Sequence, residues 1–294
     1  LTFTPKFDLI SGDKALFQQF SIEEREQIHE LVMARFKDVI ENKSLSLGGK
    51  HYLVQTTKRD VIFPMSPVKD HALGLDDSGR DIGVLLLYGF QIAMTFSMIL
   101  VLLSFVFGTV VGAIQGYFAG AIDITAQRFI EVWAAMPFLY IIILMGSVYG
   151  TSFGLLLFLM FIFGWVGISY YMRAEFLRLR SSTYVEAAKI MGLPTHIILF
   201  KHILPNALVP LITFFPFSLV GNISALSALD YLGFGLPAQT PSWGQLLSQA
   251  QDVPWAWWLI AYPAFALFIT MLLWVFVGEG VRAAFDPKKF SRIE

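Results

Sequence analysis

The stretch Tyr184-Val-Glu-Ala-Ala-Lys-Ile-Met-Gly-Leu-Pro194, which runs on to His202-Ile-Leu-Pro205, is a polar and basic interlude between two long apolar segments. Gly192 tolerates the left-handed conformation that ends helices, and Pro194 can start a helix but not continue one. This spacing predicts two short helices at an angle. The two adjacent alanines add no side-chain bulk, so another protein can approach the first helix closely. We therefore expect an exposed docking element between two membrane spans.

Composition separates a short soluble-like region from a long membrane-like one. The 294 residues are 56% hydrophobic and only 15% charged, whereas a soluble globular protein carries roughly 25% charged residues. Residues 1–84 hold 11 of the 21 Lys and Arg residues and 13 of the 22 Asp and Glu residues. The sequence contains no cysteine, which excludes disulfides and thiolate metal sites.

Five apolar stretches after residue 84 are long enough to cross a bilayer, which takes roughly 20 residues each. We expect these spans at about Leu85–Phe107, Ile130–Val148, Leu155–Met172, Leu208–Leu226 and Trp255–Val277. The chain is therefore predicted to be an all-α polytopic membrane protein. Four tryptophans near the start of the last span are typical of an interfacial aromatic belt: Trp243, Trp255, Trp257 and Trp258.

The region before the spans has the pattern of a soluble segment. Ser21-Ile-Glu-Glu24 has the form of a capping box, and apolar residues recur at helical spacing through Glu41. Residues 44–49 break this pattern, and the loose alternation over 51–63 predicts a pair of strands. The predicted organisation is a soluble segment at 1–80, a membrane domain at 81–285 with a polar loop at 180–205, and a tail at 286–294. The soluble segment is either a ligand-contacting domain or a packing lid.

The basic residues predict the orientation in the membrane. If the interlude at 173–205 is cytoplasmic, the loop near Arg128 and the C-terminal tail are cytoplasmic too. All ten Lys and Arg residues after residue 85 then lie on that side: Arg128, Arg173, Arg178, Arg180, Lys189, Lys201, Arg282, Lys288, Lys289 and Arg292. The opposite loops, around 149–154 and 227–254, carry none. The positive-inside rule then favours a cytoplasmic C-terminus and places residues 1–80 outside the cytoplasm. We expect a sixth span to precede Leu1.

The sequence has no familiar catalytic motif. It contains no phosphate-binding Gly-x-x-x-x-Gly-Lys-[Ser/Thr] loop, no His-Glu-x-x-His and no Gly-x-Ser-x-Gly. Glu131, Glu175 and Glu279 lie near predicted span ends, and each has an arginine three residues away. This spacing favours interfacial ion pairs over a proton relay. The chain is therefore predicted not to be an enzyme.

Glu186-Ala-Ala-x-x-x-Gly192 followed by His202-Ile-Leu-Pro205 resembles the cytoplasmic EAA signature of ABC importer permeases. His202 replaces the isoleucine of the general signature, as is usual in the peptide branch. Further motifs, in order, resemble the second (C-type) permease of the dipeptide/oligopeptide/nickel branch, most closely its YejE-like microcin C/peptide subgroup. They are Leu73-Gly-Leu-Asp-Asp-Ser-Gly-Arg-Asp81, Gly116-Tyr-Phe-Ala-Gly120, Leu232-Gly-Phe-Gly-Leu-Pro237, Pro241-Ser-Trp-Gly244 and Gly278-Glu-Gly-Val-Arg-Ala-Ala-Phe-Asp-Pro287. The resemblance covers about 71–290 and lacks the family's N-terminal span.

The resemblance implies a type I-like permease fold in the bacterial inner membrane, which couples ATP hydrolysis by partner subunits to alternating access. The polar loop would be a coupling helix seated in a groove of an ATPase. The implied ATPase-docking residues are Glu186, Ala187, Ala188, Gly192, His202 and Pro205. The implied partners are a second permease subunit in a heterodimer, two ABC ATPase subunits, an extracytoplasmic substrate-binding protein, a peptide substrate and the lipid bilayer, with no nucleic acid. ATP and Mg would bind the ATPases, so this chain is expected to hold no cofactor or metal.

Four polar residues in apolar surroundings are candidates for the translocation path: Gln91, Asn222, Ser224 and Ser227. Interhelical hydrogen bonding is the other role that fits such positions. An ion-coupled secondary transporter of small polar solutes is the alternative function. That class requires ionisable groups at the membrane midplane and repeated halves, and the sequence shows neither.

Overall fold

The computed structural model describes residues 43–47, 50–54, 64–69 and 71–285. The chain divides into two compact units, residues 1–62 and 63–294. In the first unit, β1 (Lys43–Leu47) and β2 (Lys50–Val54) form an antiparallel pair. The strand pair predicted at 51–63 is therefore wrong in position, since β1 occupies the stretch that we interpreted as a break. Its sequence Lys-Ser-Leu-Ser-Leu alternates with the period of a strand. The helix predicted through Glu41 lies outside the described residues.

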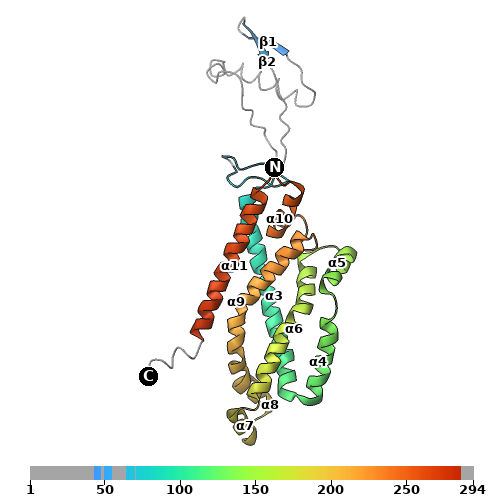
Figure 1. Cartoon of the computed structure of the whole chain (residues 1–294), viewed down its shortest axis with the longest axis vertical. Helices are drawn as coiled ribbons and strands as arrows, with labels where there is room; N and C mark the ends of the chain where they lie inside the picture. Colours follow the sequence, from blue (N-terminus) through green and yellow to red (C-terminus); the bar gives the residue numbers. More distant parts are fainter. Residues whose placement is uncertain (1–42, 48–49, 55–63, 70, 286–294) are drawn as a thin grey trace. The chain divides into compact units, whose positions relative to one another are not determined.

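The second unit is a bundle of long helices (Figure 1). Its elements are α3 (Ile82–Phe118), α4 (Gly120–Ala134), α5 (Phe138–Tyr149), α6 (Phe153–Leu179), α7 (Thr183–Ile190), α8 (Thr195–Ile197), the π-helical segment η1 (Ile198–Ile203), α9 (Leu204–Tyr231), α10 (Trp243–Asp252) and α11 (Trp258–Ala284). Four helical segments are long and apolar enough to cross a membrane, and α4 with α5 makes a fifth if the bent pair is one span. The predicted all-α membrane architecture is confirmed.

Polar caps set where two of the long helices begin. The Asp81 carboxylate accepts a hydrogen bond from the Val84 N–H at 3.2 Å before α3, and the Ser152 hydroxyl accepts one from the Leu155 N–H at 3.2 Å before α6. Each cap satisfies an amide that has no partner inside the first turn. The apolar spans therefore start at defined residues.

The second predicted span, Ile130–Val148, is not one straight helix. α4 ends at Ala134, α5 begins at Phe138, and the two are bent by 64°. Pro137 precedes α5 with an extended backbone. Proline lacks the amide donor and disfavours helical geometry in the residue before it, so the helix breaks here. Pro137 interrupts this span, as its place in the sequence predicts, and the structure adds the size of the bend.

The backbones of α3 and α6 lie in near contact. Gly108, Gly112 and Gly116 recur every four residues on α3, and all three are buried. A Cβ atom added to Gly112 would lie 2.5 Å from the carbonyl oxygen of Ser169, and one added to Gly116 would lie 2.5 Å from that of Arg173. Small residues at this spacing let membrane helices approach closely. The glycine row therefore sets the distance between the two central helices.

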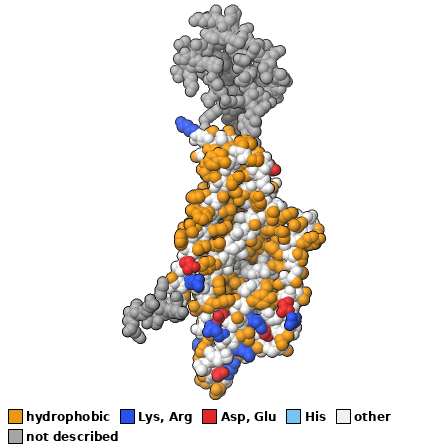
Figure 2. Space-filling model, viewed as in Figure 1, with side chains coloured by type: hydrophobic (Ala, Val, Ile, Leu, Met, Phe, Trp, Pro, Cys, Tyr) orange, Lys and Arg blue, Asp and Glu red, His pale blue; other side chains and the backbone are white. Residues whose placement is uncertain are grey.

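The two ends of the bundle differ in chemistry. α7 and α8 lie at one end and α10 at the other (Figure 1). Figure 2 shows apolar side chains over the middle of the bundle and charged side chains gathered in the half that holds α7. The three predicted ion pairs form: Arg128 with Glu131 at 2.6 Å, Arg178 with Glu175 at 2.6 Å and Arg282 with Glu279 at 4.0 Å. The charged residues near the span ends are thus paired locally, as predicted.

We expect Gly112→Ala to destabilise the protein by about 1–3 kcal/mol, because overpacking a tight contact forces the backbones apart. The added methyl group would meet a backbone oxygen, which cannot rotate aside as a flexible side chain can. Thermal unfolding of the purified protein in mild detergent measures this loss.

Gly167→Ala is the matched control, because Gly167 also lies in this helix pair and an added Cβ there meets no atom within 4 Å. Alanine is favoured over glycine inside a helix by about 0.5–1 kcal/mol, so this variant should equal or slightly exceed the wild type in stability. If the two variants unfold at the same temperature, the close α3–α6 contact is refuted.

Candidate functional site

The end of α7 has the hydrogen bonds of a Schellman motif. The Gly192 N–H donates to the Lys189 carbonyl at 3.0 Å, and the Leu193 N–H donates to the Ala188 carbonyl at 3.2 Å. Gly192 has a φ of +76°, which is the left-handed conformation that a side chain penalises. Pro194 then precedes α8 with an extended backbone. The helix end predicted at Gly192 is confirmed, and the part of Gly192 in docking stays a prediction.

One face of α7 is buried and the other is exposed. Val185 and Ala188 belong to a cluster with residues of α6, η1 and α9: Met172, Phe176, Leu179, Ile198, Ile203, Ala207 and Leu211. On the other side Glu186 is exposed, and the side chains after it include Ile190 at 86% and Met191 at 71% exposure. Large apolar side chains that are exposed in this way are typical of surfaces that contact another protein or a membrane.

The structure separates the two alanines of the predicted docking element, and the part of each in docking stays a prediction. Ala187 is exposed, but Ala188 is 1% exposed. Ala188 is rotated by about 100° around the helix axis from Ala187, and this rotation brings its side chain onto the face that packs against α6 and α9. The small size of Ala188 instead lets α7 lie close against the ends of α6 and α9. Glu186 and Ala187 remain the candidates for contact with a partner.

His202 and Pro205 lie where η1 passes into α9. The Leu204 N–H donates to the Leu199 carbonyl, one residue further back than in an α-helix; such π-turns occur frequently at functional sites. His202 is half-buried and Pro205 is exposed. Pro205 stands in the first turn of α9, directly after η1. The structure thus brings the six predicted docking residues to one end of the bundle.

Cationic side chains of α6 and α7 hold the turn between α3 and α4. Arg173 donates to the two carboxylate oxygens of Asp123 at 2.5 and 2.6 Å. Arg180, at the end of α6, donates to the Tyr117 carbonyl at 3.1 Å. The Lys189 Nζ lies 5.6 Å from the centroid of the Tyr117 ring. Sequence reasoning missed this cluster because its members are far apart in the chain and only helix packing brings them together.

The four candidate path residues differ in their burial. Gln91 and Ser224 are exposed, Asn222 is half-buried, and Ser227 is buried. Gly244 of α10 packs against the backbone of Ser227, so Ser227 belongs to the contact between α9 and α10. No side chain of these four makes a hydrogen bond to another residue in the described part of the chain. Their role in the path stays a prediction.

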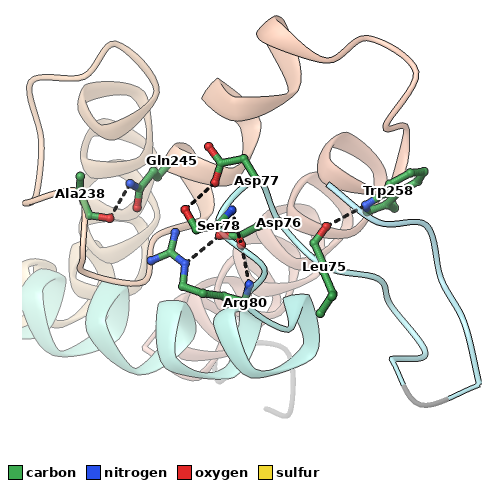
Figure 3. Close-up of polar contacts among 8 residues, drawn as sticks. All are labelled: Leu75, Asp76, Asp77, Ser78, Arg80, Ala238, Gln245 and Trp258. Carbon is green, nitrogen blue, oxygen red and sulfur yellow. Dashed lines mark hydrogen bonds and ion pairs between the residues drawn. The ribbon is translucent and has the colours of Figure 1, made fainter. Parts of the chain in front are cut away.

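At the α10 end, two indole N–H groups tie loops and helices together. Trp243 donates to the Leu86 carbonyl at 3.0 Å, and Trp258 donates to the Leu75 carbonyl at 3.3 Å (Figure 3). Trp243 is 3% and Trp258 is 2% exposed. The aromatic-belt prediction is therefore wrong for these two, because their polar atoms find partners inside the protein. The other two tryptophans of the cluster are exposed.

The loop before α3 is built around two aspartates. Asp76 is fully buried and accepts hydrogen bonds from the Ser78 N–H at 3.0 Å, the Arg80 N–H at 2.7 Å and the Arg80 Nε at 2.8 Å (Figure 3). Asp81 accepts a hydrogen bond from His71 at 2.8 Å, and this bond lowers the pKa of Asp81. The motif at 73–81 is thus a fixed turn at the start of α3.

Comparison with known proteins points to membrane transport. Residues 104–291 match the family described as binding-protein-dependent transport system inner membrane component. The chain is 44% identical over 220 residues to the peptidoglycan transport system permease protein YejE of Agrobacterium fabrum, which covers 75% of this chain and 58% of that protein. It is 44% identical over 227 residues to the inner membrane ABC transporter permease protein YejE of Escherichia coli, with 77% and 67% covered. The oligopeptide transport system permease protein OppC of Haemophilus influenzae is 35% identical over 219 residues, with 74% and 70% covered.

A solved structure supports the fold. The chain aligns with a structure of the MetNI methionine ABC transporter in its inward-facing conformations with a TM-score of 0.59, over 70% of this chain and 98% of that chain. The two are 17% identical, so this likeness concerns the fold alone. The predicted importer-permease fold and the resemblance to C-type peptide permeases of the YejE-like subgroup are both confirmed.

We expect Gly192→Ala to loosen the end of α7 by about 1–2 kcal/mol, since a side chain in the left-handed conformation is strained by that amount. Hydrogen exchange of the Gly192 position and of the Leu193 amide should then accelerate by roughly 5- to 30-fold. Gly192→Asn is the control, because asparagine visits this conformation more readily. Equal exchange rates in the alanine, asparagine and wild-type proteins would contradict the structural role of Gly192.

Proposed function

The chain belongs to the family of binding-protein-dependent transport system inner membrane components, and from that premise we propose that it is the permease subunit of an ATP-driven ABC importer for peptides or peptide-like compounds. It is a multi-pass inner membrane permease. The relatives that it resembles are permeases, so we propose a transport role in which separate ATPase subunits bind ATP and Mg and hydrolyse the nucleotide. The names of those relatives, which include oligopeptide transport, support a peptide cargo.

The two-faced helix α7 carries this proposal. Its exposed face offers Glu186, Ala187 and two large apolar side chains to a partner. Its buried face is anchored through Val185 and Ala188 to the ends of α6 and α9. Because interiors are packed closely, a displacement of α7 must also displace the helices that hold it. A partner that changes shape on binding ATP can therefore drive the bundle between inward- and outward-open states.

The proposed orientation places α7 in the cytoplasm. Every described Lys and Arg residue from 85 onward lies in the half of the bundle that holds α7 or in α11 near its end, which fits the positive-inside rule. The C-terminus is then cytoplasmic and residues 1–80 are extracytoplasmic, where a substrate-binding protein delivers cargo. The remaining proposed partners are a second permease, which completes a heterodimer, and two ATPase subunits.

The three glutamates near the ends of the spans do not support the secondary-transporter alternative. Glu131, Glu175 and Glu279 each pair with an arginine three residues away, and none of the three stands alone at the midplane as a proton carrier would.

A cysteine at Ala187 should form a crosslink to an ATPase subunit, because Ala187 is exposed on the proposed docking face. The chain has no other cysteine, so a crosslink of the assembled importer reports this position alone. Mass spectrometry of the crosslinked band identifies the partner.

Ala188→Cys is the matched control, because Ala188 is the next residue and is 1% exposed. It should form no crosslink. A crosslink of equal yield from both positions, or from neither, would refute the assignment of the exposed face.

Glu186→Arg should leave membrane insertion intact and uncouple transport from ATP hydrolysis, because the reversed charge meets the partner at the docking face. Peptide uptake by the reconstituted importer, measured together with phosphate release, gives the number of peptides transported per ATP hydrolysed. Glu279→Arg is the control, since Glu279 is also an exposed acid but lies on α11. Normal peptide uptake by the Glu186→Arg variant would contradict the assignment of Glu186 to the docking face.

A further inference from the structure

The broken span α4–α5 is loosely attached to the rest of the bundle. α4 buries only Asp123 and Ile130, and α5 buries only Ile142. Besides the ion pair of Asp123, the Trp133 indole of α4 donates to the Ile162 carbonyl of α6 at 3.0 Å. A span with so few buried side chains can shift relative to its neighbours at small cost. The few contacts that it does make therefore decide how it moves.

The turn that leads into α4 has a strained backbone. Ala119 has a φ of +51° and Gly120 has a φ of +58°. Ala119 is the non-glycine residue with positive φ in the described part of the chain. This conformation is strained for alanine, because its Cβ atom lies too close to the following carbonyl oxygen. Such strain persists only where surrounding contacts hold it in place. Tyr117 and Asp123, which stand on either side of the strained turn, are held by residues of α6, its C-cap and α7.

Five residues make these contacts, and we call them the corner clamp: Tyr117, Asp123, Arg173, Arg180 and Lys189. Arg173 grips Asp123 with two parallel hydrogen bonds, a geometry that fixes both distance and angle. The Asp123 side chain is 10% exposed, so breaking this pair leaves a nearly buried charge without a partner. The clamp is therefore stiff.

The clamp joins the docking element to the broken span. Arg173 and Arg180 lie on the last turns of α6, which leads through Ser182 directly into α7. Lys189 lies on α7 itself and reaches Tyr117 at the end of α3. A hydrogen bond of 2.6 Å from Gln127 of α4 to Gln115 of α3 adds a second tie beside the ion pair. These contacts and the short connection through Ser182 link α7, the end of α3, α6 and α4.

We propose that the corner clamp is a positioning element that carries the movement of α7 to the broken span α4–α5, with Asp123 and Arg173 as its decisive pair. This inference rests on the proposed function, since it assumes that a partner moves α7. Energetic coupling between sites travels through packed and hydrogen-bonded elements of this kind. The pair acts on the cargo only through the position of α4–α5, so it contacts neither ATP nor peptide.

Spin-label distances in the complete importer test this proposal. The second permease, the ATPases and the binding protein are included, and partner cysteines are replaced. Because this chain has no cysteine, two labels can be placed freely. One pair joins Thr195→Cys, beside α7, to Val277→Cys on α11. The other pair joins Ser147→Cys on α5 to the same Val277→Cys position on α11. All three positions are exposed.

In the otherwise unchanged protein, both distances should change when ATP and Mg are added. In Asp123→Asn the distance from residue 195 should still change, while the distance from residue 147 should stay at its nucleotide-free value. The amount of peptide moved per ATP hydrolysed should fall about tenfold. The double reversal Asp123→Arg with Arg173→Asp should recover the movement of α5, which loss of packing alone would not allow.

Glu131→Gln is the matched control, because it removes an ion pair of 2.6 Å from the same helix without touching α6 or α7. Both distances should change in it as in the wild type.

If Asp123→Asn fails to assemble, Arg180→Gln removes a more exposed part of the clamp and should give the same selective loss. Movement of α5 in Asp123→Asn equal to that in the wild type overturns the inference. If the distance between residues 195 and 277 does not change with ATP even in the unmutated protein, the proposed function is contradicted, and the inference that rests on it is contradicted as well.

Discussion

The contact between α3 and α6 is the constraint on which the rest of the second unit depends. Three glycines, one on each turn of α3, let the two backbones meet where any side chain would collide with a carbonyl oxygen. In a membrane the hydrophobic effect does not drive helices together, so such close packing has to supply the association. The pair forms a fixed centre against which α9 and the broken span are placed.

Different elements are attached to the two ends of this central helix pair. At one end, α6 leads through a short turn into α7, so the proposed docking helix follows directly from one of the two central helices. At the other end, buried tryptophans and the Asp76 turn fasten loops onto the helices by hydrogen bonds to carbonyl groups. Between the ends lies a span broken at Pro137, which buries few side chains. A closely packed helix pair thus lies beside a broken span with few buried side chains.

The sequence predicted most of what depends on local pattern. Apolar runs of sufficient length gave the number of spans, and Gly192 with Pro194 gave the end of α7 and the start of α8. Arginines three residues from glutamates gave three ion pairs. In each case the interacting groups lie within one or two helical turns, so their geometry follows from helical periodicity alone. The ordered motifs from 73–81 to 278–287 gave the family, which the match over 104–291 confirmed.

The misses concern facts that local pattern does not contain. The sequence does not say that Ala188 rather than Ala187 points inward, because that depends on which side of α7 meets the bundle. It does not separate the buried tryptophans from the exposed ones, since the carbonyls that receive their N–H groups come from segments more than 150 residues away. Asp123 and Arg173 meet across 50 residues only because the glycine row brings α3, and with it α4, close to α6. The sequence alone thus determined the elements and the family. The tertiary structure decided which faces are buried and which distant charges meet, because those contacts arise from the packing of whole helices.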